Sequence, residues 1–173
     1  MMIFEQMSYK KERCNPILLA EGRHLGYHWV VISYGTHPCA YVQIRNKEHP
    51  CYHKQYDNEI FDDLKLYGYL SYSRRYLKIP EPNNPEKTEQ DENGWWIGWD
   101  YARGVDYRGD GLNPDGKKWT TLEIVEEVMS VIIQLISKIE YNDIFDTWTS
   151  QKDYERDKAR GIIKIERKDN NER

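Results

Sequence analysis

Three clusters in this chain combine side chains that could bind or react with a ligand. The densest is Trp-Trp-Ile-Gly-Trp-Asp-Tyr at 95–101, which continues to Arg103 and Asp106. A carboxylate at the end of an aromatic strand, such as Asp100, can act as a general base, a metal ligand or a loop cap. Gly98, between two tryptophans, leaves room for a ring or a ligand to approach the backbone. We therefore expect the rim of a binding site in this stretch.

The second cluster alternates tyrosines with serines and ends in two arginines. Its members are Tyr67, Tyr69, Ser71, Tyr72, Ser73, Arg74, Arg75 and Tyr76. Tyrosine rings can stack on a base, and adjacent guanidinium groups can clamp a phosphate. A positive pocket in an acidic protein suits a small anionic ligand better than duplex nucleic acid. The alternative is an exposed sheet face that ends in a basic turn.

The third cluster comes from the tripeptide His-Pro-Cys, which occurs at 37–39 and again at 49–51. With the histidine that follows, it offers five nitrogen and sulfur ligands: His37, Cys39, His49, Cys51 and His53. Zinc binds four such groups in a tetrahedron, but this spacing matches no known zinc pattern and lacks paired Cys-x-x-Cys motifs. We therefore expect buried cysteines and hydrogen-bonded histidines, with no bound metal and no cofactor.

Several enzyme signatures are missing from the sequence. There is no phosphate-binding P-loop, no Gly-x-Ser-x-Gly elbow and no His-Glu-x-x-His zinc motif. The glycine- and aspartate-rich loop over 103–118 does not follow the calcium-loop pattern. These absences favour a binding protein over an enzyme.

For a nucleotide-like ligand, the rings would stack on the base, the arginines would meet phosphate, and Asp100 would accept from an amine or a ribose hydroxyl. The candidate ligand-binding residues are Tyr69, Tyr72, Arg74, Trp96, Asp100, Arg103 and Asp106. The main alternative is a small metal-assisted hydrolase or nuclease that uses Asp100, Asp106 and one of His37, His49 or His53. A structural or virion component is a third hypothesis.

These residues need a scaffold, and the sequence predicts an α+β fold in which a mainly antiparallel sheet of about four or more strands packs on one long buried helix. Aromatic and β-branched residues predict strands over 26–34, 39–45, 67–72 and 94–101, of which the first two form a hairpin. Apolar residues on both faces of 26–34 indicate a sheet that is covered on both sides. Residues 46–66 read as a loop with a short helix near 59–64.

The long helix is predicted over 120–140. Thr120 or Thr121 can cap its start, and Glu123 stands three residues after Thr120, as a capping box requires. Its apolar positions extend over more than half of the helix surface, so we expect the helix to be buried on several sides as it crosses the sheet.

Length and composition fit one domain over 1–150 in a chain of 173 residues. Within it, Pro80, Pro82 and Pro85 lead us to expect a flexible acidic insertion without regular structure over 78–94. A charged tail is expected over 151–173.

Composition also narrows the function class. The net charge of −4 argues against nonspecific binding to nucleic acid or to an anionic membrane. No apolar stretch is long enough for a membrane span or a signal peptide, so we expect neither a membrane protein nor a secreted one. The three cysteines then read as free thiols in a reducing cytoplasm. The strands and the broad helix could support a homo-oligomer.

Five phrases of the sequence together carry a family resemblance. They are Gly-Tyr-x-x-Val-Val at 26–31, His-Pro-Cys-Ala-Tyr-Val at 37–42, the set His49, Pro50, Tyr52, Lys54, Tyr56 and Asp57, Gly-Tyr-Leu-Ser-Tyr-Ser at 68–73, and Trp-Trp-Ile-Gly-Trp-Asp-Tyr-Ala at 95–102. This set resembles a widespread group of small, mostly uncharacterised proteins encoded by bacteriophages and prophages. The resemblance covers about residues 24–130.

The resemblance implies a phage accessory protein that acts in the host cytoplasm. Such proteins often oppose host defence, either by binding a host protein or by sequestering a nucleotide signal. Relatives commonly read Ala-His-x-Gly-Asp after the tryptophan phrase, whereas this chain has Arg103 in place of the histidine and keeps Asp106. An arginine can still bind an anion, but it does not serve as the proton acceptor that a histidine provides.

Overall fold

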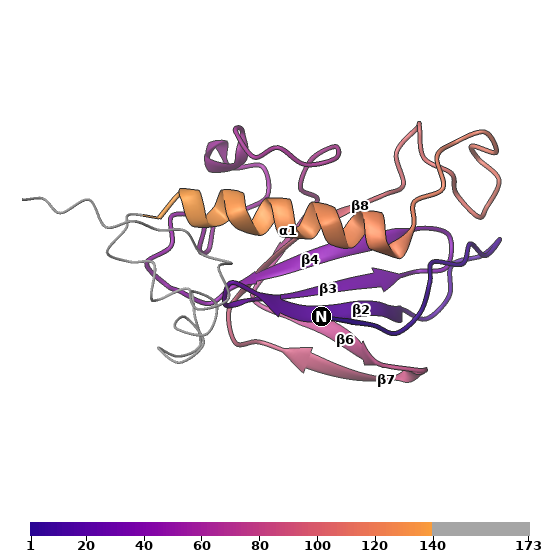
Figure 1. The fold of residues 1–173 in the computed structure, drawn as a ribbon, viewed down its shortest axis with the longest axis horizontal. Coiled ribbons are helices and arrows are strands. Elements are labelled where there is room, and N and C mark those ends of the chain that lie inside the picture. The colour runs from indigo at the N-terminus through magenta and orange to yellow at the C-terminus, as the bar shows by residue number, and fades with distance from the viewer. Residues whose placement is uncertain (140–173) are drawn as a thin grey trace, which may run out of the picture.

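The computed structural model describes residues 1–139. The expected tail over 151–173 and the last position of the predicted helix lie outside the described residues. Figure 1 shows one long helix lying across a twisted sheet, with a separate hairpin on the opposite side of that sheet. The predicted α+β class, mostly antiparallel sheet with one helix, is confirmed.

The main sheet has six strands in the order β1-β2-β3-β4-β8-β5, and every neighbouring pair is antiparallel. The strands are β1 (Met2–Ile3), β2 (Ile17–His24), β3 (Tyr27–Ser33), β4 (Pro38–Ile44), β5 (Tyr72–Arg74) and β8 (Trp95–Asp100). The predicted hairpin of the second and third strands is therefore present as β3 and β4. β8 contains Trp95, Trp96 and Trp99, and it lies between β4 and β5, one strand in from the edge of the sheet.

The prediction of a strand over 67–72 is wrong in its position. β5 begins only at Tyr72, although the Ser71 N–H already donates to the Gly98 carbonyl of β8. Gly68 has a φ of +71°, a left-handed backbone that interrupts an extended segment. β2 was not predicted at all, and a register shift between Leu18 and Ala20 interrupts the alternation that would have marked it.

The expectation that prolines prevent regular structure over 78–94 is also wrong. This segment forms most of an antiparallel hairpin of β6 (Leu77–Glu81) and β7 (Asn84–Asp91). Pro82 and Asn83 form its turn, and Asn83 has the positive φ of 60° that a type II turn requires after proline. A two-stranded hairpin has open edges, so it can include Pro80, which donates no hydrogen bond.

Strand alternation divides the core into two layers. Trp95, Ile97 and Trp99 of β8 point toward the helix, together with alternate residues of β3 and β4. Trp96 points to the opposite face, into a smaller cluster that Leu77 of the hairpin covers. Both faces of the sheet are therefore buried, as the sequence of residues 26–34 predicted.

The helix α1 (Thr121–Ser137) begins with the predicted capping box, in which Thr120 Oγ1 accepts from the Glu123 backbone N–H and a Glu123 carboxylate oxygen accepts from the Thr120 N–H. It packs on the sheet through one face only. The loop over 61–67 contacts it on another side, but Leu122 is 49% exposed and Ile133 is 56% exposed, so the expected burial on several sides is present only in part. Within residues 1–139, no helix has both the length and the apolar character needed to cross a bilayer.

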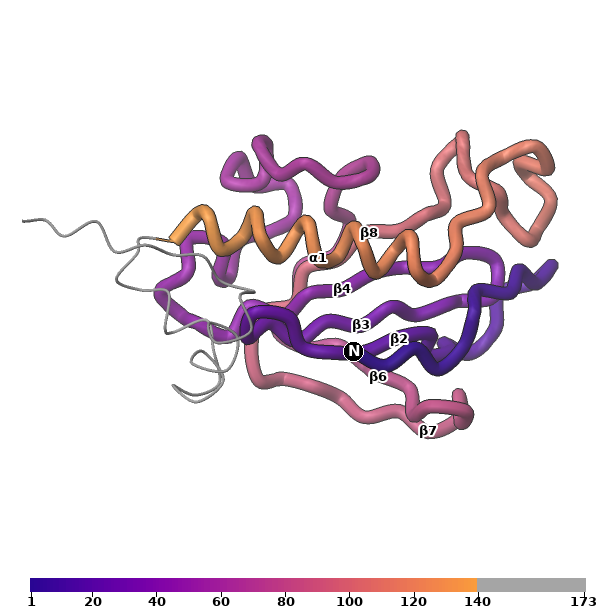
Figure 2. Tube along the Cα trace, viewed as in Figure 1, coloured from indigo at the N-terminus to yellow at the C-terminus, as the bar shows by residue number. Residues whose placement is uncertain are grey.

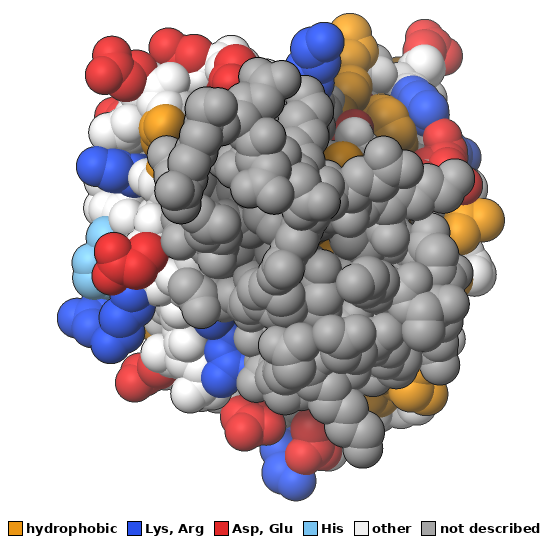
Figure 3. Space-filling model, turned by 60° about the vertical axis from the view of Figure 1, so that its left-hand side comes forward, with side chains coloured by type: hydrophobic (Ala, Val, Ile, Leu, Met, Phe, Trp, Pro, Cys, Tyr) orange, Lys and Arg blue, Asp and Glu red, His pale blue; other side chains and the backbone are white. Residues whose placement is uncertain are grey.

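Loops from distant parts of the chain gather at the ends of these elements. The tube in Figure 2 shows the N-terminal segment and the loop after β8 together at one end of the molecule. Both segments bond to the turn between β3 and β4: the Gly109 N–H donates to the Thr36 carbonyl, and the Lys10 N–H donates to the Gly35 carbonyl. Where Figure 3 shows coloured side chains, acidic and basic groups are interspersed.

Candidate functional site

The structure separates the seven candidate ligand-binding residues into two groups. Tyr69, Asp100, Arg103 and Asp106 meet where the loop before β5 contacts the loop after β8. Tyr72, Arg74 and Trp96 lie along the face of the sheet that is turned away from α1. Four of the seven predicted residues are therefore neighbours in the structure, and the other three lie on a different surface of the sheet.

Asp106 is a buried structural centre of the first group. Its side chain is fully buried, and its oxygens accept three hydrogen bonds: from Tyr67 Oη at 2.6 Å, from Trp119 Nε1 at 2.9 Å and from the Arg103 backbone N–H at 2.8 Å. A carboxylate with this many donors is satisfied inside the protein. The expectation that Asp106 contacts a ligand is therefore not supported by its position, because no face of it is open.

The same hydrogen bonds change Tyr67. Burial, together with the bond from the phenol to Asp106, raises the pKa of Tyr67 to about 12. The Tyr67 ring also stacks parallel to Tyr101, with a distance of 5.6 Å between the ring centroids. Tyr67 is thus a packed hydrogen-bond donor and holds the loop before β5 against the loop after β8.

Arg103 and Tyr69 form a stacked pair beside Asp106. The Arg103 guanidinium lies 3.7 Å from the centre of the Tyr69 ring, and Nη2 donates to the Tyr69 carbonyl at 2.9 Å. Gly68 makes this approach possible, since a Cβ at that position would stand 1.8 Å from Arg103 Nε. Tyr69 itself is 67% exposed. The arginine therefore holds an exposed ring in one orientation.

Asp100 caps the end of β8. Its two oxygens accept from the Ala102 backbone N–H at 3.1 Å and from Ser71 Oγ at 3.2 Å. This is the loop-cap role among the three that its sequence position suggested. It ties Ser71, and so the start of β5, to the strand beside it.

A pocket of about 390 Å³ opens next to the stacked pair of Arg103 and Tyr69. Its lining residues are Tyr56, Asp57, Phe61, Asp62, Leu64, Leu66, Gly68, Tyr69 and Leu70. Phe61 and Leu70 are buried and form an apolar floor, while Tyr56 and Tyr69 stand exposed at the wall. The lining contains two carboxylates and no lysine, arginine or histidine. The pocket therefore combines aromatic faces with negative charge.

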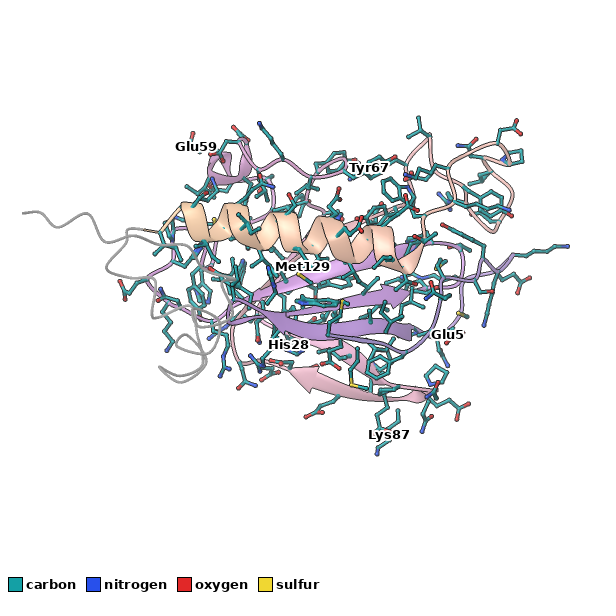
Figure 4. All side chains as sticks on the ribbon, in the orientation of Figure 1. Glu5, His28, Glu59, Tyr67, Lys87 and Met129 are labelled. Atoms are coloured by element: carbon teal, nitrogen blue, oxygen red, sulfur yellow. The ribbon has the colours of Figure 1, made fainter. Side chains whose placement is uncertain are left out.

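The helix α1 anchors the loop that builds this pocket. Gln134 bonds to the backbone of Lys65 in both directions, with its oxygen accepting and its Nε2 donating, each at 2.7 Å. Glu127 accepts from the Tyr67 backbone N–H at 3.0 Å. In Figure 4 the labelled Glu59 and Tyr67 both lie above α1, whereas His28 and Lys87 lie below it. The pocket is thus on the helix side of the molecule and apart from the hairpin.

Sequence reasoning did not select most of the residues that line this pocket. Tyr56 and Asp57 appeared only in the family phrases, and Phe61 and Asp62 in no motif. One signal was available, because Phe61 is the buried apolar residue of a short 3-10 helix (Glu59–Phe61) that carries acidic residues on either side.

Trp96 is closed to any ligand. Its side chain is fully buried between the sheet and the hairpin, with its ring 5.2 Å from that of His28. The gap expected at Gly98 is filled by the protein itself, since a Cβ there would lie 2.4 Å from Tyr41 Cδ1. Tyr72 packs edge-to-face on Tyr41 at 5.2 Å. Of this group, only Arg74 is exposed.

The histidines of the His-Pro-Cys repeats are not arranged as metal ligands. Both ring nitrogens of His49 are engaged: Nε2 donates to the Leu135 carbonyl at 3.0 Å, and Nδ1 accepts from the Cys51 N–H at 3.0 Å. His53 stacks on Tyr52, with ring centroids 4.4 Å apart. His37 Nδ1 lies 2.9 Å from Thr36 Oγ1. Among residues 1–139, no three His, Cys, Asp or Glu side chains are grouped so that they could hold a metal ion.

The cysteines are free thiols in the structure. Burial raises the pKa of Cys39 to about 12 and that of Cys51 to about 11. Both thiols are therefore protonated at neutral pH and lack the thiolate that a nucleophile needs.

Comparisons with known proteins add no relative to this picture. No protein-family model matches the chain, and no curated protein or solved structure was found to be similar to it.

Proposed function

We propose that this chain is a non-enzymatic binding protein whose pocket over residues 56–70 receives a positively charged side chain of a protein partner. The observation that carries the proposal is the lining of the pocket, which joins two tyrosine rings to Asp57 and Asp62 without a basic residue. Arg103 already lies over one face of the Tyr69 ring, so the incoming cation uses the other face of Tyr69 or the ring of Tyr56. A cation over a tyrosine face gains about 0.5–1 kcal/mol at an exposed site. A carboxylate adds charge-assisted hydrogen bonds to an ammonium or guanidinium group.

The same lining disfavours the nucleotide-like anion that we expected from the sequence. A phosphate in this pocket would face two carboxylates, and like charges at short range repel. Arg103, which was expected to meet that phosphate, already stacks on Tyr69 and donates to its carbonyl. Binding of a host protein is therefore the better supported of the two modes.

The resemblance to phage and prophage proteins supplies the biological setting of the proposal. In that setting the protein acts in the host cytoplasm as an accessory factor, and its partner is a component of host defence. This part of the proposal rests on analogy between families, and the pocket supports only the binding chemistry.

The binding mode can be tested by NMR titration of the chain with N-acetyl-arginine amide and, separately, with adenosine monophosphate. We expect saturable shifts of the Tyr56 and Tyr69 resonances with the arginine derivative, with a Kd in the millimolar range. The double variant Asp57→Asn with Asp62→Asn should abolish these shifts. The matched control is Glu86→Gln with Glu89→Gln, which removes the same charge from two exposed positions of β7.

Two results would overturn the proposal. One is the absence of saturable shifts with the arginine derivative. The other is binding of adenosine monophosphate at Tyr56 and Tyr69 that becomes tighter in the Asp57 and Asp62 variant. The second result would restore the nucleotide hypothesis.

A further inference from the structure

The outer edge of β5 is a second surface with the character of a docking site, and it does not depend on the pocket. β5 is the last strand of the six-stranded sheet, and within residues 1–139 its only strand partner is β8. An edge strand presents backbone N–H and C=O groups that can pair with another extended chain. No backbone hydrogen bond in the described part of the chain reaches Tyr72, Ser73 or Arg74 from that open side.

Basic residues lie at the end of β5 and in the chain that follows it: Arg74 ends β5, Arg75 comes next, and Lys78 belongs to β6. Arg74, Arg75 and Lys78 are all exposed, and none has an acidic partner among the described residues. The uncompensated charges at β5 therefore form a local positive field on a protein whose net charge is −4.

Exposed charges also protect edge strands from pairing with like edges. The opposite edge of the sheet, β1, is a strand of two residues, Met2 and Ile3, and exposed Arg23 of β2 lines the same hollow as Met2. A positive edge repels basic strands and attracts acidic ones, so it selects its partner by charge.

We propose that β5 is a docking edge for an extended acidic segment of a protein partner, which adds to the main sheet as a further strand. Main-chain hydrogen bonds to those backbone groups of residues 72–74 that face outward supply part of the affinity, and Arg74 and Arg75, with Lys78 in the following strand, select carboxylates on the incoming strand. The exposed ring of Tyr76 lies within the same stretch and adds contact area. The phosphate clamp expected from these arginines is replaced by recognition of carboxylates along a strand.

The experiment measures fluorescence anisotropy of a labelled peptide of about six residues, the usual length of a strand, in which glutamate and threonine alternate. We expect the full chain to bind it, and Arg74→Glu with Arg75→Glu to weaken binding by about tenfold or more. The control is Lys10→Glu with Lys11→Glu, an equal charge change at two exposed lysines on another loop. A peptide of equal charge with alternate backbone amides methylated should not bind, because it cannot pair with the edge.

Other outcomes would overturn the inference. Equal binding by the methylated peptide, or by a single-stranded oligonucleotide, would show that charge alone is recognised. A mass that rises with protein concentration and falls in the arginine variant would identify a second copy, docked through its acidic β7, as the occupant. Since these probes and variants differ from those for the pocket, either proposal can fail alone.

Discussion

Replacing Asp106 by asparagine is expected to destabilise the protein by about 3 kcal/mol, although the side chain keeps its size. The carboxylate accepts from Tyr67, Trp119 and the Arg103 N–H. Hydrogen bonds to a charged group contribute about 1.5–3 kcal/mol each, and those between neutral groups about 0.5–1.5 kcal/mol. The remaining amide oxygen can still serve Tyr67 and Trp119, but each bond loses about 1 kcal/mol.

The third bond is lost altogether. The amide nitrogen of asparagine would face the Arg103 N–H, and a buried donor without an acceptor costs about 1–3 kcal/mol. Relief from burying a charge offsets part of this total. At about 2–4 °C per kcal/mol for a domain of this size, the melting temperature should fall by about 9 °C.

Urea unfolding followed by tryptophan fluorescence measures this change, and the control is Asp115→Asn, an exposed position in the same loop. The variant should also lower the pKa of Tyr67 from about 12, since the bond to Asp106 is one of the causes of its rise. An unfolding free energy within about 0.5 kcal/mol of the unmodified chain would refute the structural role of Asp106.

Three further predictions concern packing and pH. Gly98→Ala should cost about 2 kcal/mol in urea unfolding because its Cβ would overlap Tyr41, whereas Gly104→Ala, which meets nothing, should not; equal midpoints would contradict this. Burial lowers the pKa of His49 below the ordinary value of 6.5, so the stability that it contributes is present above pH 6.5 and is lost as the pH falls below that value. His49→Gln should remove this part of the dependence of stability on acid pH, and an unchanged pH profile of stability would contradict the prediction. Tyr9, Tyr67 and Tyr72 have a pKa raised to about 12, so the stability that they contribute is present below pH 10 and is lost as the pH rises through 12. Absorbance titration should find these tyrosines ionising only above pH 11 or on unfolding, and ionisation near pH 10 would exclude such burial.

The parts of the fold that the sequence predicts well are those whose local signal agrees with the tertiary structure. β3, β4 and β8 are dense in aromatic and β-branched residues, and α1 has an unambiguous capping box. The hairpin over 77–91 was missed because proline is read as a strand breaker, while a hairpin with open edges and a Pro82-Asn83 turn tolerates it.

The candidate site was harder to predict because the type of a residue does not determine whether its side chain is buried. Asp106 looks like a ligand-binding carboxylate until its donors are known, and Tyr67 and Trp119 lie 39 and 13 residues away in the chain. Trp96 and its neighbour Trp95 differ only in parity, and the covering of both faces by α1 and the hairpin buries both. The pocket depends on how residues 56–70 fold back on α1, which no spacing in that loop encodes.

The pocket and the β5 edge carry opposite charges, and Ser73 connects them. Ser73 Oγ accepts from the Tyr56 N–H at 2.9 Å and donates to Gln55 Oε1 at 3.0 Å, so the wall of the pocket is bonded to the edge strand. One partner segment with a basic residue followed by acidic ones could therefore engage both surfaces. The second contact would then form at a high effective concentration, and two weak contacts would combine into a much tighter complex. A segment with only basic or only acidic residues would meet repulsion at one of the two surfaces, so this arrangement would select its partner by charge.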